Sequence, residues 1–149
     1  MPSRFFPLYN IDQPVGPGKA NKPDDVRLVQ ALLIELSRFD QNDWVALIPR
    51  GSLGLATTGT FDSTLETWIL ALQNFLVSNL GGVKLWKADG VIDPMPPAGP
   101  VSTSSRFQSG RFSTLAMICN RLWKRNRDAY LGIGDQYRVP WIPSEHFEG

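Results

Sequence analysis

The sequence is poor in the residues that build disulfides and metal centres: among 149 residues it has one cysteine, Cys119, and one histidine, His146. A single cysteine excludes an intrachain disulfide, so cysteine usage gives no information on the redox compartment. One cysteine and one histidine cannot form a three-ligand zinc centre without several carboxylates, and no His-Glu-x-x-His motif occurs. A zinc peptidase is therefore excluded, and we expect no metal ion and no other cofactor.

Long apolar runs and a strong net charge are also missing. No stretch approaches the roughly 18 apolar residues of a membrane span, and Pro7 interrupts the N-terminus before a signal peptide could form. The net charge is only +1, which argues against nucleic acid or an anionic membrane as the partner. The last third is mildly basic, and we interpret this as one solvated helix face carrying Arg121, Lys124, Arg125 and Arg127; binding to an acidic partner is the alternative.

Signatures of catalysis are weak. No Gly-x-Ser-x-Gly motif occurs, and Gly132-Ile133-Gly134 lacks the strand and helix of a phosphate loop. A glycosidase needs two carboxylates that face one cleft. Four carboxylates at two turns could approach one another, but helix capping and turn formation explain them more simply: Asp62, Glu66, Asp89 and Asp93. We therefore expect a protein that is not an enzyme.

Apolar residues at helical spacing predict three helices. The first covers about residues 23–39, with Pro23 in its first turn and Asp24 and Asp25 at the positive end of its dipole. The second starts at a cap formed by Asp62 or by a Ser63–Glu66 capping box, and ends near residues 81–82. The third begins near residue 113 and ends before residue 132, and it should bury Cys119 as a small hydrophobe.

The remaining segments contain many helix breakers. We expect an extended N-terminal arm over residues 1–20, anchored by an aromatic and apolar group made of Phe5, Phe6, Leu8 and Tyr9. Residues 40–58 should form a loop in which residues 44–48 make one short strand. Residues 95–113 form an insertion before the third helix, and residues 127–149 form an extended C-terminal tail. The prediction is an all-α domain over residues 21–126, with long irregular arms.

Two short segments repeat each other. Residues 58–62 and residues 89–93 each place a glycine turn before an apolar residue and an acidic residue. In the second copy the following Thr-Leu step is postponed to Thr114-Leu115, beyond the insertion. A duplicated turn–helix unit packed on a leading helix is the simplest architecture that fits this repeat.

The order of these motifs resembles the peptidoglycan-binding-like domain of bacteria and phages. The resemblance covers about residues 21–126: the leading helix from residue 23, the turn at residues 59–62, the helix that ends in Leu72-Gln73-Asn74-Phe75, and the turn at residues 89–94. It implies a small three-helix bundle with two Asp-Gly-type turn repeats. It also implies a non-catalytic module that recognises cell-wall peptidoglycan.

Tryptophans in loops are candidates for stacking on a sugar face. Trp44, Trp86 and Trp141 lie in loops or the tail, whereas Trp68 and Trp123 lie in helices and should belong to the core. The predicted ligand-binding residues are Asp43, Trp44, Arg50, Lys84, Trp86 and Asp89, with Lys87 on the same rim. An alternative stays open, because the same tryptophans could simply cover the edges of a small bundle.

Two functions follow from this resemblance and from the added segments. The first is recognition of peptidoglycan, either as muropeptide or as glycan. The second is a protein–protein module that reuses the fold as an adaptor, cargo or structural component of a phage-like or contractile secretion particle. Without a signal peptide, we expect synthesis in the bacterial cytoplasm and, for a wall-directed role, delivery to the periplasm or wall by a route other than general secretion.

Overall fold

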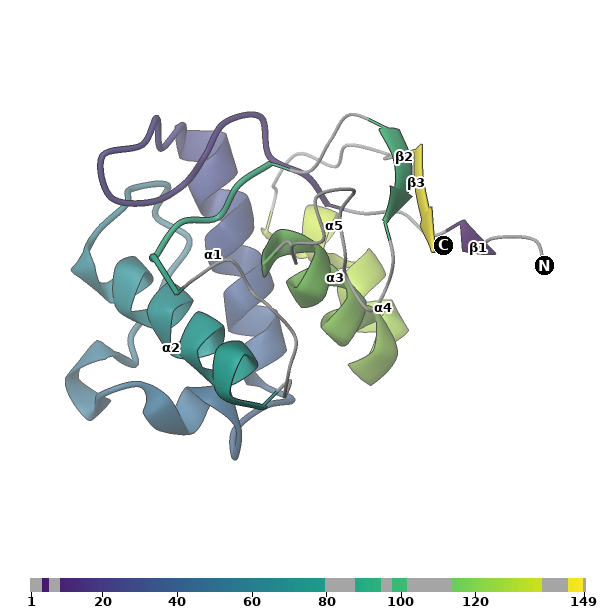
Figure 1. Ribbon diagram of the computed structural model, residues 1–149. Helices are drawn as coiled ribbons and strands as arrows, with labels where there is room; N and C mark the ends of the chain where they lie inside the picture. The colour runs from purple at the N-terminus through teal and green to yellow at the C-terminus, as the bar shows by residue number, and fades with distance from the viewer. Residues whose placement is uncertain are drawn as a thin grey trace.

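Three main helices form the centre of the molecule (Figure 1). They are α1 (Pro23–Ser37), α2 (Ser63–Asn79) and α3 (Thr114–Arg125). The computed structural model describes residues 4–5, 9–79, 88–94, 98–101, 114–137 and 145–148, and it places side chains in 9–78, 88–94 and 114–137. The prediction of a helical protein with three main helices is confirmed.

Helix α1 forms for the reasons that its sequence indicates. Pro23 occupies its first turn together with Asp24 and Asp25. Its apolar stripe, including Val26, Val29, Leu33 and Leu36, is fully buried. Helix α1 therefore packs against the other elements along most of its length.

Asp62 caps helix α2. Its side-chain oxygen accepts a hydrogen bond from the amide of Leu65 at 2.9 Å, and its carbonyl accepts one from the amide of Glu66 at 3.1 Å. The apolar stripe of α2 then faces the core through Leu65, Trp68, Ile69, Leu72 and Leu76. Residues 80–87, which include the predicted end of this helix, lie outside the described residues.

The loop from α1 to α2 contains two short 3-10 helices, η1 (Trp44–Leu47) and η2 (Arg50–Ser52), so the strand expected at residues 44–48 is wrong. The spacing of the buried side chains explains the error. Trp44, Val45 and Ile48 point into the core while Leu47 is 55% exposed. Such spacing matches one face of a helical turn rather than the alternation of a strand.

The described N-terminal segment is part of the core. Tyr9, Ile11 and Val15 are buried, and Val15 forms a two-way backbone bridge with Ile92 at 3.0 and 2.8 Å. The buried Asp25 carboxylate of α1 accepts the amides of residues 12 and 13 at 3.0 Å each. Anchoring by Tyr9 is confirmed, and the side chains of Phe5, Phe6 and Leu8 lie outside the described residues.

The expectation of an extended tail from residue 127 is wrong for residues 127–137, which form α4 (Arg127–Leu131) and α5 (Ile133–Tyr137). Asn126 separates α3 from α4 and caps α4, because its side-chain oxygen accepts the amide of Ala129 at 3.0 Å. We expected the third helix to end just before residue 132. Helix α3 instead ends at Arg125, and α4 continues from Arg127 to Leu131 after the single residue Asn126. Tyr130 and Ile133 are fully buried, so this segment completes the core.

A small sheet joins the two ends of the chain to the insertion. Its strands are β1 (Arg4–Phe5), β2 (Ala98–Val101) and β3 (Glu145–Glu148), in the order β1-β3-β2. β3 pairs antiparallel with β1 and parallel with β2. Figure 1 shows the sheet to one side of the helices. No strand was predicted in these segments; the rest of the insertion, at residues 95–97 and 102–113, lies outside the described residues.

Candidate functional site

The two sequence repeats adopt the same turn. Gly59 has a φ of 78° and Gly90 a φ of 77°, a left-handed conformation that residues with a side chain rarely adopt. In each turn, the side chain of the residue before the glycine accepts a hydrogen bond from the amide of the residue after it. The hydroxyl of Thr58 accepts the amide of Thr60 at 3.1 Å, and the carboxylate of Asp89 accepts the amide of Val91 at 2.9 Å.

A buried glutamine clamps the first turn. Gln30, in the middle of α1, accepts the amide of Gly59 at 3.0 Å through its side-chain oxygen. Its side-chain nitrogen donates to the hydroxyl of Thr58 at 3.0 Å and to the carbonyl of Thr60 at 3.4 Å. Gln30 is 1% exposed, so its amide group is satisfied by the turn rather than by bulk water.

A second buried glutamine clamps the second turn in the same manner. Gln73 of α2 accepts the amide of Gly90 at 2.9 Å and donates to the carbonyl of Val91 at 3.0 Å. Its nitrogen also donates to the hydroxyl of Thr114, the first residue of α3, at 3.2 Å. The second clamp therefore fixes the turn and the start of the next helix together.

Sequence reasoning missed both glutamines as turn-holding residues. The available signal was a polar residue inside each apolar stripe: Leu-Val-Gln-Ala-Leu-Leu over residues 28–33 and Ala-Leu-Gln-Asn-Phe-Leu over residues 71–76. A buried amide at such a position needs hydrogen-bond partners. The nearby glycine turns are the partners that the pattern requires.

Polar side chains gather around the second turn. A Cβ atom added to Gly90 would lie 3.6 Å from Cγ of Glu66, which places this side chain beside the turn. Partial burial, together with the charge of Asp89, raises the pKa of Asp93, while the charge of Lys19 opposes the shift. Of the four carboxylates expected to approach one another, Glu66 from the first turn lies beside the second turn, which itself carries Asp89 and Asp93. Asp62 instead caps α2, as described above.

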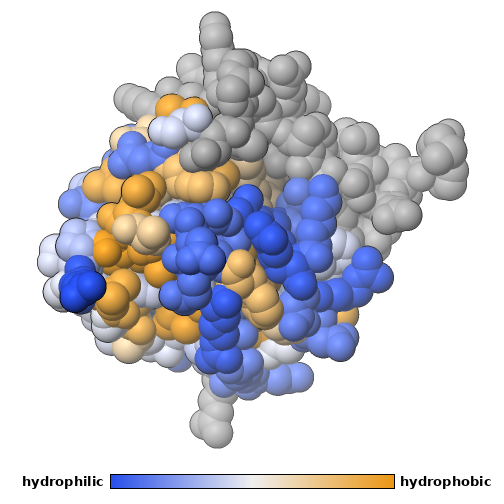
Figure 2. Space-filling model, turned by 90° about the horizontal axis from the view of Figure 1, so that it is seen from below, coloured by the Kyte–Doolittle hydropathy of each residue, from blue (hydrophilic) through white to orange (hydrophobic). Residues whose placement is uncertain are grey.

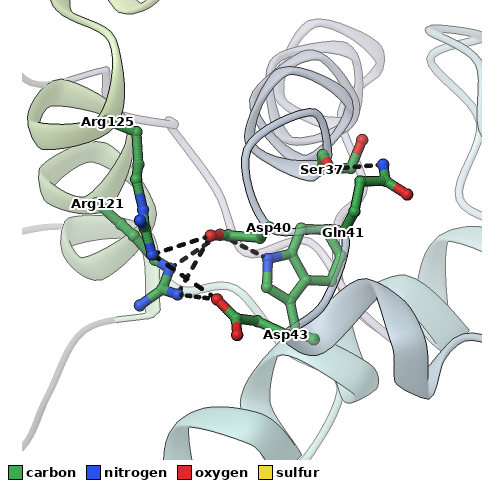
Figure 3. Close-up of polar contacts among 7 residues, drawn as sticks. Ser37, Asp40, Gln41, Asp43, Arg121 and Arg125 are labelled. Carbon is green, nitrogen blue, oxygen red and sulfur yellow. Dashed lines mark hydrogen bonds and ion pairs between the residues drawn. The ribbon is translucent and has the colours of Figure 1, made fainter.

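A network of ion pairs fixes the loop at the end of α1 to α3 (Figure 3). The fully buried Asp40 carboxylate accepts hydrogen bonds from Nε1 of Trp44 at 2.9 Å and from Nε of Arg121 at 2.9 Å. Arg125 reaches the same carboxylate at 3.4 Å, and Arg121 also contacts Asp43 at 3.0 Å. Each side chain in this network has at least one partner within the protein, which indicates a structural role for the network.

These contacts correct the interpretation of two basic residues. Arg121 and Arg125 are not simply part of a solvated helix face, because both pair with Asp40. The guanidinium of Arg127 lies over the ring of Trp123 at 4.2 Å, so it too has a partner. Lys124, Arg125 and Arg127 are all exposed, as expected for a solvated face.

The predicted ligand-binding residues are not brought together as one site. Trp44 is fully buried, with its ring centroid 5.8 Å from that of Trp68, so the expectation that it stacks on a sugar is wrong. Asp43 is ion-paired with Arg121, Arg50 is exposed on η2, and Asp89 holds the second turn. Three candidates, Lys84, Trp86 and Lys87, together with Trp141, lie outside the described residues.

The helical tryptophans and the cysteine are placed as predicted. Trp68 is 4% exposed, and the partly buried Trp123 packs against the core. Cys119 is fully buried, and burial raises its pKa to about 12. Because the nucleophile is the thiolate, this cysteine is not suited to nucleophilic chemistry at neutral pH.

Within the described ranges, no three histidine, cysteine, aspartate or glutamate side chains gather closely enough to hold a metal ion. Among the described helices, none combines the length and hydropathy needed to cross a membrane.

The chain matches no protein-family model, no curated protein and no solved structure.

Proposed function

We propose that this chain is a non-catalytic binding module that recognises bacterial cell-wall peptidoglycan. The observation that supports the proposal is the duplicated turn: Gly59 and Gly90 share one backbone conformation, and each is held by a buried glutamine. A three-helix bundle with two such turns is the architecture that the sequence resemblance implies.

The described residues that this proposal assigns to wall contacts are polar. Among the described candidates, Arg50 and Asp89 offer a cation and a carboxylate to the amides, hydroxyls and carboxylates of a muropeptide. The burial of Trp44 removes this residue from the proposed contacts. Lys84 and Trp86 remain proposed ligand contacts.

Co-sedimentation with purified sacculi tests wall recognition. We expect the wild-type chain to be retained and Asp89→Asn to be retained less well, because asparagine keeps the acceptor for the amide of Val91 and removes only the charge. Asp128→Asn, an exposed change on α4, is the matched control and should bind as the wild type does. Wild-type retention no greater than that of an unrelated protein of equal charge would reject the proposal.

A second candidate function is recognition of a protein, as an adaptor, cargo or structural component of a phage-like or contractile secretion particle. The observation that favours it is the loop from α1 to α2, where Trp44 is buried while Leu47 and Leu53 are exposed. Deleting both ends of the chain cannot test this function, because Tyr9 and Tyr130 belong to the core. The test has to use point substitutions in the exposed loop.

A further inference from the structure

The loop from α1 to α2 carries two exposed leucines, one before and one after an arginine in the sequence. Between residues 44 and 61 the only charged residue is Arg50. Leu47, three residues before it, is 55% exposed, and Leu53, three residues after it, is 47% exposed. We call Leu47, Arg50 and Leu53 the loop surface.

The backbone that carries the loop surface is held in place from beneath. Trp44 is buried against Trp68, and the indole nitrogen of Trp68 donates to the carbonyl of Ser52 at 2.6 Å. The amide of Leu53 donates to the carbonyl of Arg50 at 3.4 Å, which is the spacing of one 3-10 turn. Residues three apart in such a turn lie on the same side, so Arg50 and Leu53 share a face. A surface fixed in this way loses little conformational entropy when it binds.

Arg50 differs from the other arginines whose side chains are described. Arg27, Arg38, Arg121 and Arg125 form ion pairs with carboxylates, and Arg127 lies over a tryptophan ring. Among the described residues Arg50 has neither kind of partner. Its guanidinium is therefore available to a carboxylate of another molecule.

Apolar residues gather on the side of the molecule that carries this loop. Figure 2 shows the face seen from below, where apolar surface lies next to a band of hydrophilic residues. Exposed apolar surface next to polar residues is a feature of protein interaction sites. Arginine is also over-represented among the residues that dominate binding energy in such sites.

We propose that the loop surface docks a protein partner that presents a carboxylate between large apolar side chains. The guanidinium of Arg50, which has no ion pair among the described residues, is complementary to the carboxylate, and the exposed leucines are complementary to the apolar groups. A muropeptide supplies carboxylates but only small apolar groups, so a protein segment fits this surface better. The inference deepens the second candidate function and rests on it; it does not depend on wall recognition.

Selection from a phage-displayed library of random 12-residue peptides, panned against the full chain, tests the inference. We expect enrichment of peptides in which Asp or Glu is flanked by Leu, Ile, Phe or Trp. Binding of a selected peptide, followed by fluorescence anisotropy, should weaken about tenfold or more in Arg50→Glu and in Leu47→Ser. Lys124→Gln, an exposed change on α3, should leave it unchanged. Panning against Arg50→Glu should instead enrich Lys or Arg between apolar residues.

Several results would overturn the inference. Enriched peptides whose binding is unaffected by Arg50→Glu, Leu47→Ser and Leu53→Ser would reject the location while keeping protein recognition. No enrichment of an acidic–apolar motif would reject protein recognition by this surface altogether. A wild-type dimer in sedimentation that becomes monomeric in Leu47→Ser would identify a second copy of the chain as the occupant. Loss of sacculus binding in the two leucine variants would assign the surface to the wall.

Discussion

The two glycine turns have the same geometry but different surroundings. Around the first turn, Thr58 and Thr60 are exposed, and the chain continues directly into α2. Around the second turn, Val91 and Ile92 are buried, Ile92 bridges to Val15, and the clamp reaches the first residue of α3. One unit therefore serves twice, once as a local helix entry and once as the point where the N-terminal segment, α2 and α3 meet.

Replacing the two buried glutamines should give the largest difference in stability between the two turns. Gln73→Ala leaves the amide of Gly90 and the carbonyl of Val91 without partners in a buried site, and we expect a loss of about 3–4 kcal/mol in the free energy of unfolding. Gln30→Ala should cost about 1–2 kcal/mol, because water can reach the exposed threonines of the first turn. Urea denaturation measures both, with the exposed Gln136→Ala as a neutral control. Equal losses for the two clamps would contradict the proposed difference.

Replacing each turn glycine by alanine should destabilise the first turn more than the second, the reverse of the order expected for the glutamines. Gly59→Ala places a Cβ atom 3.1 Å from Arg27 Cγ and 3.3 Å from the backbone oxygen of Pro23, in addition to the strain of a positive φ. We expect a loss of about 2–3 kcal/mol. Gly90→Ala meets only ordinary contacts at 3.6 Å or more, so its cost should be the backbone strain, about 1–2 kcal/mol. A larger loss for Gly90→Ala in the same urea titrations would show that the second turn is more tightly packed than described.

Removing the turn carboxylates should have smaller effects. Asp62→Ala removes the cap of α2 and should cost about 1 kcal/mol. Asp89→Ala removes one hydrogen bond within the turn but also a negative charge next to Asp93, so we expect about 0.5 kcal/mol. Thermal unfolding at pH 7 compares the two variants. A loss for Asp89→Ala as large as that for Asp62→Ala would mean that the charge near Asp93 matters little.

The rate at which Cys119 reacts with a thiol reagent should report on how firmly the second turn is held. Cys119 is fully buried and lies within 3.6 Å of the carbonyl of Tyr9, whose segment is bridged to the second turn by Val15. At pH 8 we expect slow labelling by a disulfide reagent in the wild type, because burial raises the pKa of this thiol to about 12. Gln73→Ala should speed labelling more than Gln30→Ala does. Full labelling of one thiol per chain in urea is the control.

The sequence allowed prediction of the three main helices because each carries a long apolar stripe at helical spacing. The stripe of α1, for example, is buried where the pattern indicates. Short elements could not be assigned in this way. Residues 44–48 were too few to distinguish a 3-10 turn from a strand, and the tail residues 127–137 showed prolines nearby but no stripe. Their structure depends on contacts with distant segments, such as the pair of Tyr9 and Tyr130.

The candidate site was less predictable than the fold. A tryptophan in a loop offers the same sequence pattern whether it is exposed or buried, and Trp44 is buried because Asp40 supplies a partner for its indole nitrogen. Arg121 pairs with that same carboxylate across 81 positions of sequence, which no local pattern reveals. The repeat itself was visible, but its clamps were not, because Gln30 and Gln73 lie at different distances along the chain from the glycines they hold.

Hydrogen exchange at two backbone amides tests the central claim that the chain contains one clamped turn built twice. The amides of Gly59 and Gly90 both donate to buried glutamine oxygens. We therefore predict that both are protected in the native protein, that Gly90 exchanges more slowly than Gly59, and that each glutamine-to-alanine change releases its own glycine first. Exchange of either amide at the rate of an open loop would contradict the account.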